Sequence, residues 1–138
     1  MSLVLISHSR AIGEGLRDMV AQVAGPDVRV AIAAGTEDGR LGTSAPLITE
    51  AIRWALADGP SGPVEGALVL LDLGSAALSL DLALEDLSDA ERARTRVSEA
   101  PLVEGAVLAA VQASVGASLD DAFAAAAGAA SMTKIPRD

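Results

Sequence analysis

Cysteine is absent from the 138-residue sequence, and histidine occurs once, at His8. The absence of cysteine excludes disulfides and thiolate metal sites, and a single histidine argues against a zinc site. Aromatic residues make up only 1% of the chain, although 51% of it is hydrophobic. We therefore expect a core of Ala, Leu, Val and Ile side chains, in a chain long enough for one domain.

Positive charge is scarce as well. The 10 Lys and Arg residues face 19 Asp and Glu residues, which gives a formal net charge of −9. This balance argues against nucleic acid as a partner, because phosphates are met by basic surfaces. No apolar run approaches the roughly 18 residues of a membrane span, and no basic segment precedes an apolar run at the N-terminus. We therefore expect a cytoplasmic protein with no signal peptide and no membrane partner.

Apolar periodicity predicts strands that alternate with helices. Strands are expected at residues 3–6, 28–32, 67–71 and 92–97. Helices are expected at residues 11–24, 45–58, 76–87 and 102–111, and Ser118 opens a last Ala-rich helix. Gly25-Pro26 suits the end of the first helix, and Ser44 suits the N-cap of the second. These elements predict a single domain over residues 1–131 and a C-terminal tail over residues 132–138.

The alternation predicts an α/β fold, in which an open parallel sheet has helices on both faces. Residues 3–6 and 67–71 are almost wholly apolar and belong in the middle of the sheet, whereas the two alternating strands belong at its edges. The strand order is then 2-1-3-4. Connections diverge above the first and third strands, and α/β sheets bind ligands at such a point. The residues placed there are 7–9 and 72–75.

His8 is the side chain best suited to chemistry at this point. Its unperturbed pKa of about 6.5 leaves a neutral, nucleophilic nitrogen near pH 7. Asp72 is placed to accept a hydrogen bond from one imidazole nitrogen, which would fix the tautomer and leave the other nitrogen free. Glycine-bearing loops and the start of a helix just after His8 would supply N–H groups for an anion. The alternative is a histidine that is merely satisfied by hydrogen bonds in a loop.

Nucleotide-binding motifs are missing, since the sequence has neither a phosphate-binding Gly-Lys-Ser/Thr loop nor Gly-x-Gly-x-x-Gly after the first strand. An anion site centred on a histidine then indicates covalent phosphorylation of His8. A Ser-His-Asp hydrolase is the competing interpretation, because Ser7, Ser9 and Ser75 are near. It lacks the Gly-x-Ser-x-Gly elbow, and a serine next to the histidine in sequence is poorly placed for activation.

Segments from almost the whole chain resemble the DhaM family, the phosphotransfer subunits of phosphoenolpyruvate-dependent dihydroxyacetone kinases, which have a mannose-type EIIA fold. The segments, in chain order, are Val4-Leu5-Ile6-Ser7-His8-Ser9, Gly35-Thr36-Glu37-Asp38-Gly39 through Gly42-Thr43-Ser44, Leu70-Leu71-Asp72-Leu73-Gly74-Ser75-Ala76 and Ala100-Pro101-Leu102-Val103-Glu104-Gly105-Ala106.

The resemblance implies that His8 takes phosphate on Nε2 from the phosphocarrier protein HPr. It further implies transfer to ADP on DhaL, with the resulting ATP phosphorylating dihydroxyacetone on DhaK. His8 and Asp72 would be catalytic, and no cofactor or metal would be bound. The residues expected to line the phosphate site are Ser7, Ser9, Arg10, Thr36, Gly39, Gly74 and Ser75.

Some members of this family continue into HPr-like and enzyme-I-like domains, so this chain is expected to use separate HPr and enzyme I proteins. The Ala/Val faces of residues 102–130 exceed what packing on one sheet face needs, which predicts a homodimer. The resemblance implies the same. Two other functions stay open: the EIIA component of a mannose-family sugar transporter, and a non-catalytic regulatory phosphoprotein.

Overall fold

A computed structural model describes residues 1–137 of the chain, and Asp138 of the predicted tail lies outside the described residues. Its strands are β1 (Ser2–Ser7), β2 (Arg29–Ala34), β3 (Ala67–Leu71) and β4 (Thr95–Ser98). Its helices are α1 (Arg10–Ala24), α2 (Ala45–Leu56), α3 (Ala77–Asp86), α4 (Asp89–Ala93), α5 (Leu102–Ser114) and α6 (Leu119–Gly128), with short 3₁₀ turns η1 (Gly74–Ala76) and η2 (Ala129–Ser131). None of the helices within residues 1–137 combines the length and the apolar character needed to cross a bilayer.

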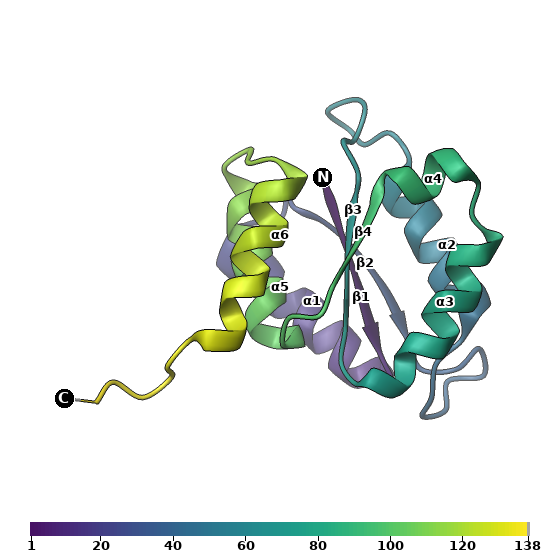
Figure 1. Cartoon of the computed structure of the whole chain (residues 1–138), viewed down its shortest axis with the longest axis horizontal. Coiled ribbons are helices and arrows are strands. Elements are labelled where there is room, and N and C mark those ends of the chain that lie inside the picture. The colour runs from purple at the N-terminus through teal and green to yellow at the C-terminus, as the bar shows by residue number, and fades with distance from the viewer. Residues whose placement is uncertain (138) are drawn as a thin grey trace.

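The strands form one parallel sheet in the order β2-β1-β3-β4 (Figure 1). The predicted fold class and strand order are therefore confirmed. Pairing aligns Ile6 of β1 with Leu71 of β3, and Ser7 with Ala34 of β2. The carboxyl ends of the two central strands thus lie side by side.

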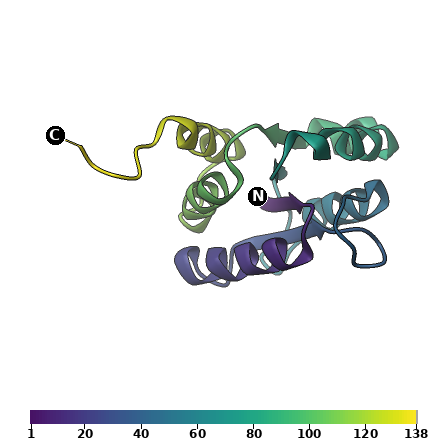
Figure 2. The same cartoon turned by 90° about the horizontal axis from the view of Figure 1, so that it is seen from below.

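The side chains of the central strands alternate between two cores. Leu3 and Leu5 pack in the core with α1, α5 and α6, whereas Val4 and Ile6 pack in the core with α2 and α3. Figure 2 shows these two groups of helices. Both cores are built from Ala, Leu, Val and Ile, and within residues 1–137 no aromatic side chain is fully buried. The expected aliphatic core is confirmed.

Three of the four strands differ in their bounds from the prediction, and β1 is one residue longer at each end than expected. Residues 92 and 93 belong to α4 and not to a strand, because Ser88 and Glu91 form a reciprocal capping box that starts a short helix. β4 consequently covers only Thr95–Ser98. The second strand was expected at residues 28–32, whereas β2 continues to Ala34, because Ala33 and Ala34 also pair with β1 and are buried.

Helix α1 approaches β2 very closely at Gly13. A Cβ atom built on Gly13 would lie 2.6 Å from the Cβ of Ala34, nearer than real Cβ contacts allow. Gly15, two residues further along the same helix, is exposed and has no heavy atom within 4 Å of such a Cβ. A methyl group at position 13 would therefore collide with β2, whereas a methyl group at position 15 would contact no other residue.

We predict that Gly13→Ala lowers the free energy of unfolding by about 1–3 kcal/mol, because the added methyl must push α1 away from β2. Gly15→Ala is the matched control and should raise the free energy of unfolding by about 0.5–1 kcal/mol, the usual gain for alanine in a helix. Urea unfolding of both variants measures the difference. Equal stabilities would mean that α1 does not pack on Ala34 as described.

Candidate active site

His8 and Asp72 lie just beyond the carboxyl ends of the central strands β1 and β3. The His8 Nδ1 atom is 2.9 Å from Oδ1 of Asp72, and the two side chains are 19% and 14% exposed. The predicted hydrogen bond between Asp72 and the imidazole is therefore present. The ring is partly open to solvent, so it is accessible to a reacting group.

The Asp72 carboxylate is the acceptor of a dense set of hydrogen bonds. Besides His8 Nδ1, it accepts from the Ser7 hydroxyl (3.0 Å), the His8 backbone N–H (2.9 Å) and the Leu73 backbone N–H (2.8 Å). Burial acts to raise the pKa of Asp72, but the hydrogen bonds from His8, Ser7 and Leu73 outweigh it and hold the pKa below its ordinary value. The carboxylate is thus ionised at neutral pH.

An ionised carboxylate can only accept hydrogen bonds, so the proton of a neutral His8 ring lies on Nδ1. Nε2 then carries the lone pair. The Ser75 hydroxyl lies 3.0 Å from Nε2 and donates to it in this tautomer. The main chain of His8 is held on both sides, because its N–H bonds to Asp72 and its carbonyl accepts from the Gly42 N–H at 2.9 Å.

Ser7 and Ser9 hold the turn between β1 and α1. Ser7 is completely buried, and its hydroxyl accepts from the Ser9 N–H (3.1 Å) while it donates to Asp72. The Ser9 hydroxyl caps α1 by accepting from the Ile12 N–H (3.3 Å). α1 begins two residues after His8, and its first N–H groups have no acceptor inside the helix.

The loop after β2 reaches the site through its backbone. The Thr36 hydroxyl is bonded inside this loop, to Asp38 and to the backbone of Arg40, and the structure gives it no bond to His8. Gly39 lies against the Arg10 guanidinium, since a Cβ on this glycine would be 3.5 Å from Arg10 Nη1. The loop thus places Gly39 and Arg10 together, while Thr36 shapes the loop from within.

Gly42 is a site residue that the sequence analysis missed. Its N–H fixes the His8 carbonyl, its φ is +141°, and a Cβ there would lie 2.8 Å from Thr36 Cγ2. The only signal in the sequence was its place in the glycine-bearing loop. A backbone N–H can donate a hydrogen bond whatever side chain the residue carries, so the residue type at position 42 did not indicate this bond.

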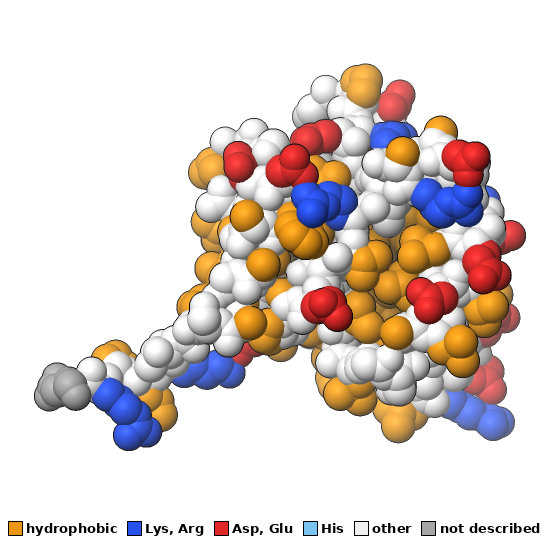
Figure 3. Space-filling model, viewed as in Figure 1, with side chains coloured by type: hydrophobic (Ala, Val, Ile, Leu, Met, Phe, Trp, Pro, Cys, Tyr) orange, Lys and Arg blue, Asp and Glu red, His pale blue; other side chains and the backbone are white. Residues whose placement is uncertain are grey.

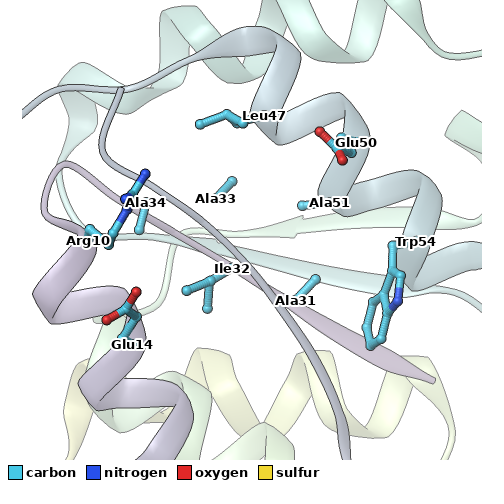
Figure 4. Close-up of a pocket in the computed structure, with 10 residues that line it drawn as sticks. All are labelled: Arg10, Glu14, Ala31, Ile32, Ala33, Ala34, Leu47, Glu50, Ala51 and Trp54. Carbon is cyan, nitrogen blue, oxygen red and sulfur yellow. The ribbon is translucent and has the colours of Figure 1, made fainter. Parts of the chain in front are cut away.

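A separate groove of about 320 Å³ runs along the open edge of β2 (Figure 4). Arg10 and Glu14 from α1 form one wall, and Leu47, Glu50 and Trp54 from α2 form the other. His8 and Asp72 do not line it. Nor do residues 1–137 contain a group of three or more His, Asp or Glu side chains arranged to hold a metal ion.

The chain matches the family model EIIA-man, described as the PTS system fructose IIA component, over residues 2–123. It is 42% identical to the phosphoryl donor subunit DhaM of the PEP-dependent dihydroxyacetone kinase 2 of Listeria innocua, over 86% of this chain and 90% of that protein. It is 41% identical to the phosphoryl donor subunit DhaM of Escherichia coli over 87% of this chain. That match spans only 25% of the Escherichia coli protein.

Among solved structures, the chain is similar to the crystal structure of the unknown function protein EF1359. The TM-score is 0.80 and the sequence identity 34%, with 93% of this chain and 95% of that chain covered. The sequence-based resemblance to the DhaM and mannose-type EIIA families is therefore confirmed.

The pKa of Asp72 gives a prediction about stability. Since folding lowers this pKa, Asp72 stabilises the fold fully above the ordinary pKa of aspartate, and this stabilisation is lost as the pH falls through the lower, folded-state pKa. Asp72→Asn should therefore lower the free energy of unfolding at pH 7 by about 1–3 kcal/mol, because the amide disrupts the hydrogen bonds to Ser7 and His8.

Urea unfolding of wild type and Asp72→Asn between pH 3 and pH 7 measures this effect. The other carboxylates titrate in both proteins, so the difference between the two curves isolates Asp72. The difference should shrink toward pH 3. A difference that stays constant with pH would contradict a lowered pKa.

Proposed function

The chain belongs to the EIIA-man family, and we propose that it is a phosphohistidine carrier of the DhaM type. His8 accepts a phosphoryl group from HPr and transfers it to ADP bound to DhaL, which supports the phosphorylation of dihydroxyacetone in the DhaK–DhaL complex. The observation that carries this proposal is the hydrogen bond of 2.9 Å between His8 Nδ1 and Asp72, whose side chains are both partly exposed. It leaves Nε2 as the nucleophile.

In the loading step, the Nε2 lone pair attacks the phosphorus atom of phosphorylated HPr. The Nε2–P bond forms as the N–P bond of the donor histidine breaks, and the donor imidazole leaves. Positive charge develops on the His8 ring, and Asp72 stabilises it because the carboxylate holds the Nδ1 proton throughout. No proton has to be removed from Nε2, so the site needs orientation and not a strong base.

In the discharge step, a β-phosphate oxygen of ADP attacks the same phosphorus in line. The Nε2–P bond breaks, ATP forms, and His8 returns to its neutral tautomer. The transferred group carries charge on its equatorial oxygens, and donors near Nε2 stabilise it. The Ser75 hydroxyl, 3.0 Å from Nε2, supports this role, and we infer that the first N–H groups of α1 and the charge of Arg10 act with it.

A hydrolase remains the second candidate, because Ser75, His8 and Asp72 are spaced as a Ser-His-Asp triad. In hydrolases of this kind the N–H of the residue after the nucleophilic serine stabilises the oxyanion. Here that N–H, on Ala76, is bonded to the Leu73 carbonyl at 3.0 Å. The N–H of Ala77 is likewise bonded to the Gly74 carbonyl. With both donors occupied, we favour the phosphocarrier.

We also propose that residues 1–131 act as one unit and that this unit is a homodimer. Apolar side chains on the outer surface of α1 and α5 are more than one-third exposed, as on Ile12, Met19, Val23 and Val111. Exposed apolar surface on neighbouring helices favours association of two copies.

We predict that the protein gains about 80 Da, the mass of a phosphoryl group, when it is incubated with phosphoenolpyruvate, enzyme I and HPr. The gain should be lost in acid, as expected of a phosphohistidine. His8→Ala should show no gain, because the nucleophile is missing. Asp72→Asn should slow loading by about 10²-fold, because the tautomer and the ring orientation are no longer fixed. Intact-protein mass spectrometry at successive times measures the phosphoryl loading of wild type and of both variants.

Ser75→Ala is the control that separates the carrier from the hydrolase. It should still gain the phosphoryl group, because Ser75 only donates a hydrogen bond to Nε2. A hydrolase would instead require Ser75 for ester cleavage, and wild type would then hydrolyse p-nitrophenyl acetate much faster than Ser75→Ala. Phosphate on wild type that survives in acid, or loading of His8→Ala, would contradict the carrier.

We predict that phosphorylated protein, freed of HPr and enzyme I, converts ADP to ATP only when DhaL is present. The expected yield approaches one ATP for each phosphorylated His8, since one phosphoryl group is carried at a time. Luciferase detection of ATP measures it, with His8→Ala as the blank. Protein that loads but never discharges to ADP would leave the sugar-transporter EIIA or the regulatory phosphoprotein as the function.

A further inference from the structure

A hydrogen bond outside the site around His8 joins two elements that hold this residue. The hydroxyl of Thr43, in the loop between β2 and α2, lies 2.7 Å from the hydroxyl of Ser79 in α3, and either group can donate. Both residues are half-buried. Within residues 1–137, this is the only hydrogen bond between the loop of residues 35–44 and the segment of residues 73–86.

Each end of this bond lies next to a residue that contacts His8. Thr43 follows Gly42, whose N–H donates to the His8 carbonyl at 2.9 Å. Ser79 lies about one helical turn after Ser75, whose hydroxyl is 3.0 Å from Nε2, and η1 runs directly into α3 between the two serines. The contacts therefore form a closed ring, which leads from the main chain of His8 through both hydroxyls back to its imidazole.

Apolar packing holds η1 and the first turn of α3 only weakly. Between positions 73 and 79, Ala76 is the one residue that is fully buried. The exposed residues of this segment are Leu73, Gly74, Ser75, Ala77 and Leu78. On the side of β4 the segment borders a groove of about 570 Å³, which Figure 3 shows as a hollowed, apolar area. The place of Ser75 relative to His8 therefore depends strongly on polar contacts.

We propose that Thr43 and Ser79 are positioning residues for phosphoryl transfer at His8, because their hydrogen bond holds the segment that carries Ser75 beside Nε2. This inference rests on the proposed function, since it assumes that Nε2 takes the phosphoryl group. Neither hydroxyl touches the reacting atoms, and both act through Ser75. A donor stabilises the charge of the transferred group only if it is already held in place, so loss of the bond slows the transfer.

The first test is Thr43→Val, which replaces the hydroxyl by a methyl group of similar size. The loading rate at saturating phosphorylated HPr should fall about three- to tenfold, the effect of one lost hydrogen bond. The half-saturating concentration of phosphorylated HPr should change little, because the exposed side chains stay the same. Thr43→Ser keeps the hydroxyl and should load at close to the wild-type rate. Ser79→Ala removes the other partner and should slow loading as Thr43→Val does, so it tests the same bond if Thr43→Val does not fold.

A double-mutant cycle tests whether Thr43 acts through Ser75. If it does, Thr43→Val should slow the loading of wild type but should not slow the loading of Ser75→Ala any further, whereas independent effects would multiply. Thr49→Val is the matched control, because the Thr49 hydroxyl also reaches α3, at 3.5 Å from the Ala83 carbonyl, but one turn further along this helix. It should load at the wild-type rate.

Nuclear magnetic resonance of the imidazole gives a signature that a loss of stability alone would not produce. His8 is the only histidine of the chain, so its ring ¹⁵N signals need no further assignment. In wild type and in Thr43→Val the proton should lie on Nδ1, because Asp72 is unchanged. The Nε2 signal of Thr43→Val should move toward its position in Ser75→Ala, because the bond from Ser75 is formed for less of the time.

The outcomes separate this inference from the proposed function. If wild type is loaded but Thr43→Val keeps the wild-type rate, slows Ser75→Ala equally, or is matched by Thr49→Val, the positioning role is wrong and the carrier function stands. Phosphoramidate serves as a second donor, whose P–N bond breaks as the Nε2–P bond forms and ammonia leaves. If wild type is loaded by neither phosphorylated HPr nor phosphoramidate, the carrier function is wrong and the positioning role falls with it.

Discussion

The carboxylate of Asp72 is the contact on which the site depends, because it joins the ends of two strands that are far apart in the sequence. It accepts hydrogen bonds from the backbone and ring of His8, from Ser7 and from Leu73. These contacts require that Ile6 pairs with Leu71. That register is fixed by burial, since both faces of β1 are covered and a slip of one residue would exchange its two sets of side chains. The chemistry of the imidazole thus depends on the packing of the aliphatic core.

Small residues bring the helices close enough to complete the site. Gly13 lies in the first turn of α1 and lets this helix pack directly on Ala34. The close approach therefore fixes where the first N–H groups of α1 lie relative to His8. Gly105 likewise lets α5 approach its neighbours closely. A Cβ on this glycine would lie 2.8 Å from the Cβ of Ala100 and 2.9 Å from Leu70 Cδ2. A core almost free of aromatic residues suits helices that pack this tightly.

The sequence was enough to predict the parts of the fold that follow from apolar periodicity. The two apolar runs gave the central strands, and their ends brought His8 and Asp72 together. It failed at residues 92 and 93, where alternating charges suggested a strand and the capping box of Ser88 and Glu91 formed a helix instead. Gly42 was missed and Thr36 was expected to line the site, because hydrogen bonds within a loop depend on its closed conformation and not on residue type. Relatives confirm the family, while the roles of the residues around His8 remain predictions.

A carrier histidine must be open to two partners and yet held in a single orientation. His8 combines the two because its backbone is fixed by Asp72 and Gly42, while Nε2 has, among residues 1–137, a single partner, an exposed serine that can turn away. In the proposed function, the same imidazole meets a donor and an acceptor in succession, and the hydrogen bond from Nδ1 to Asp72 holds its orientation for both transfers.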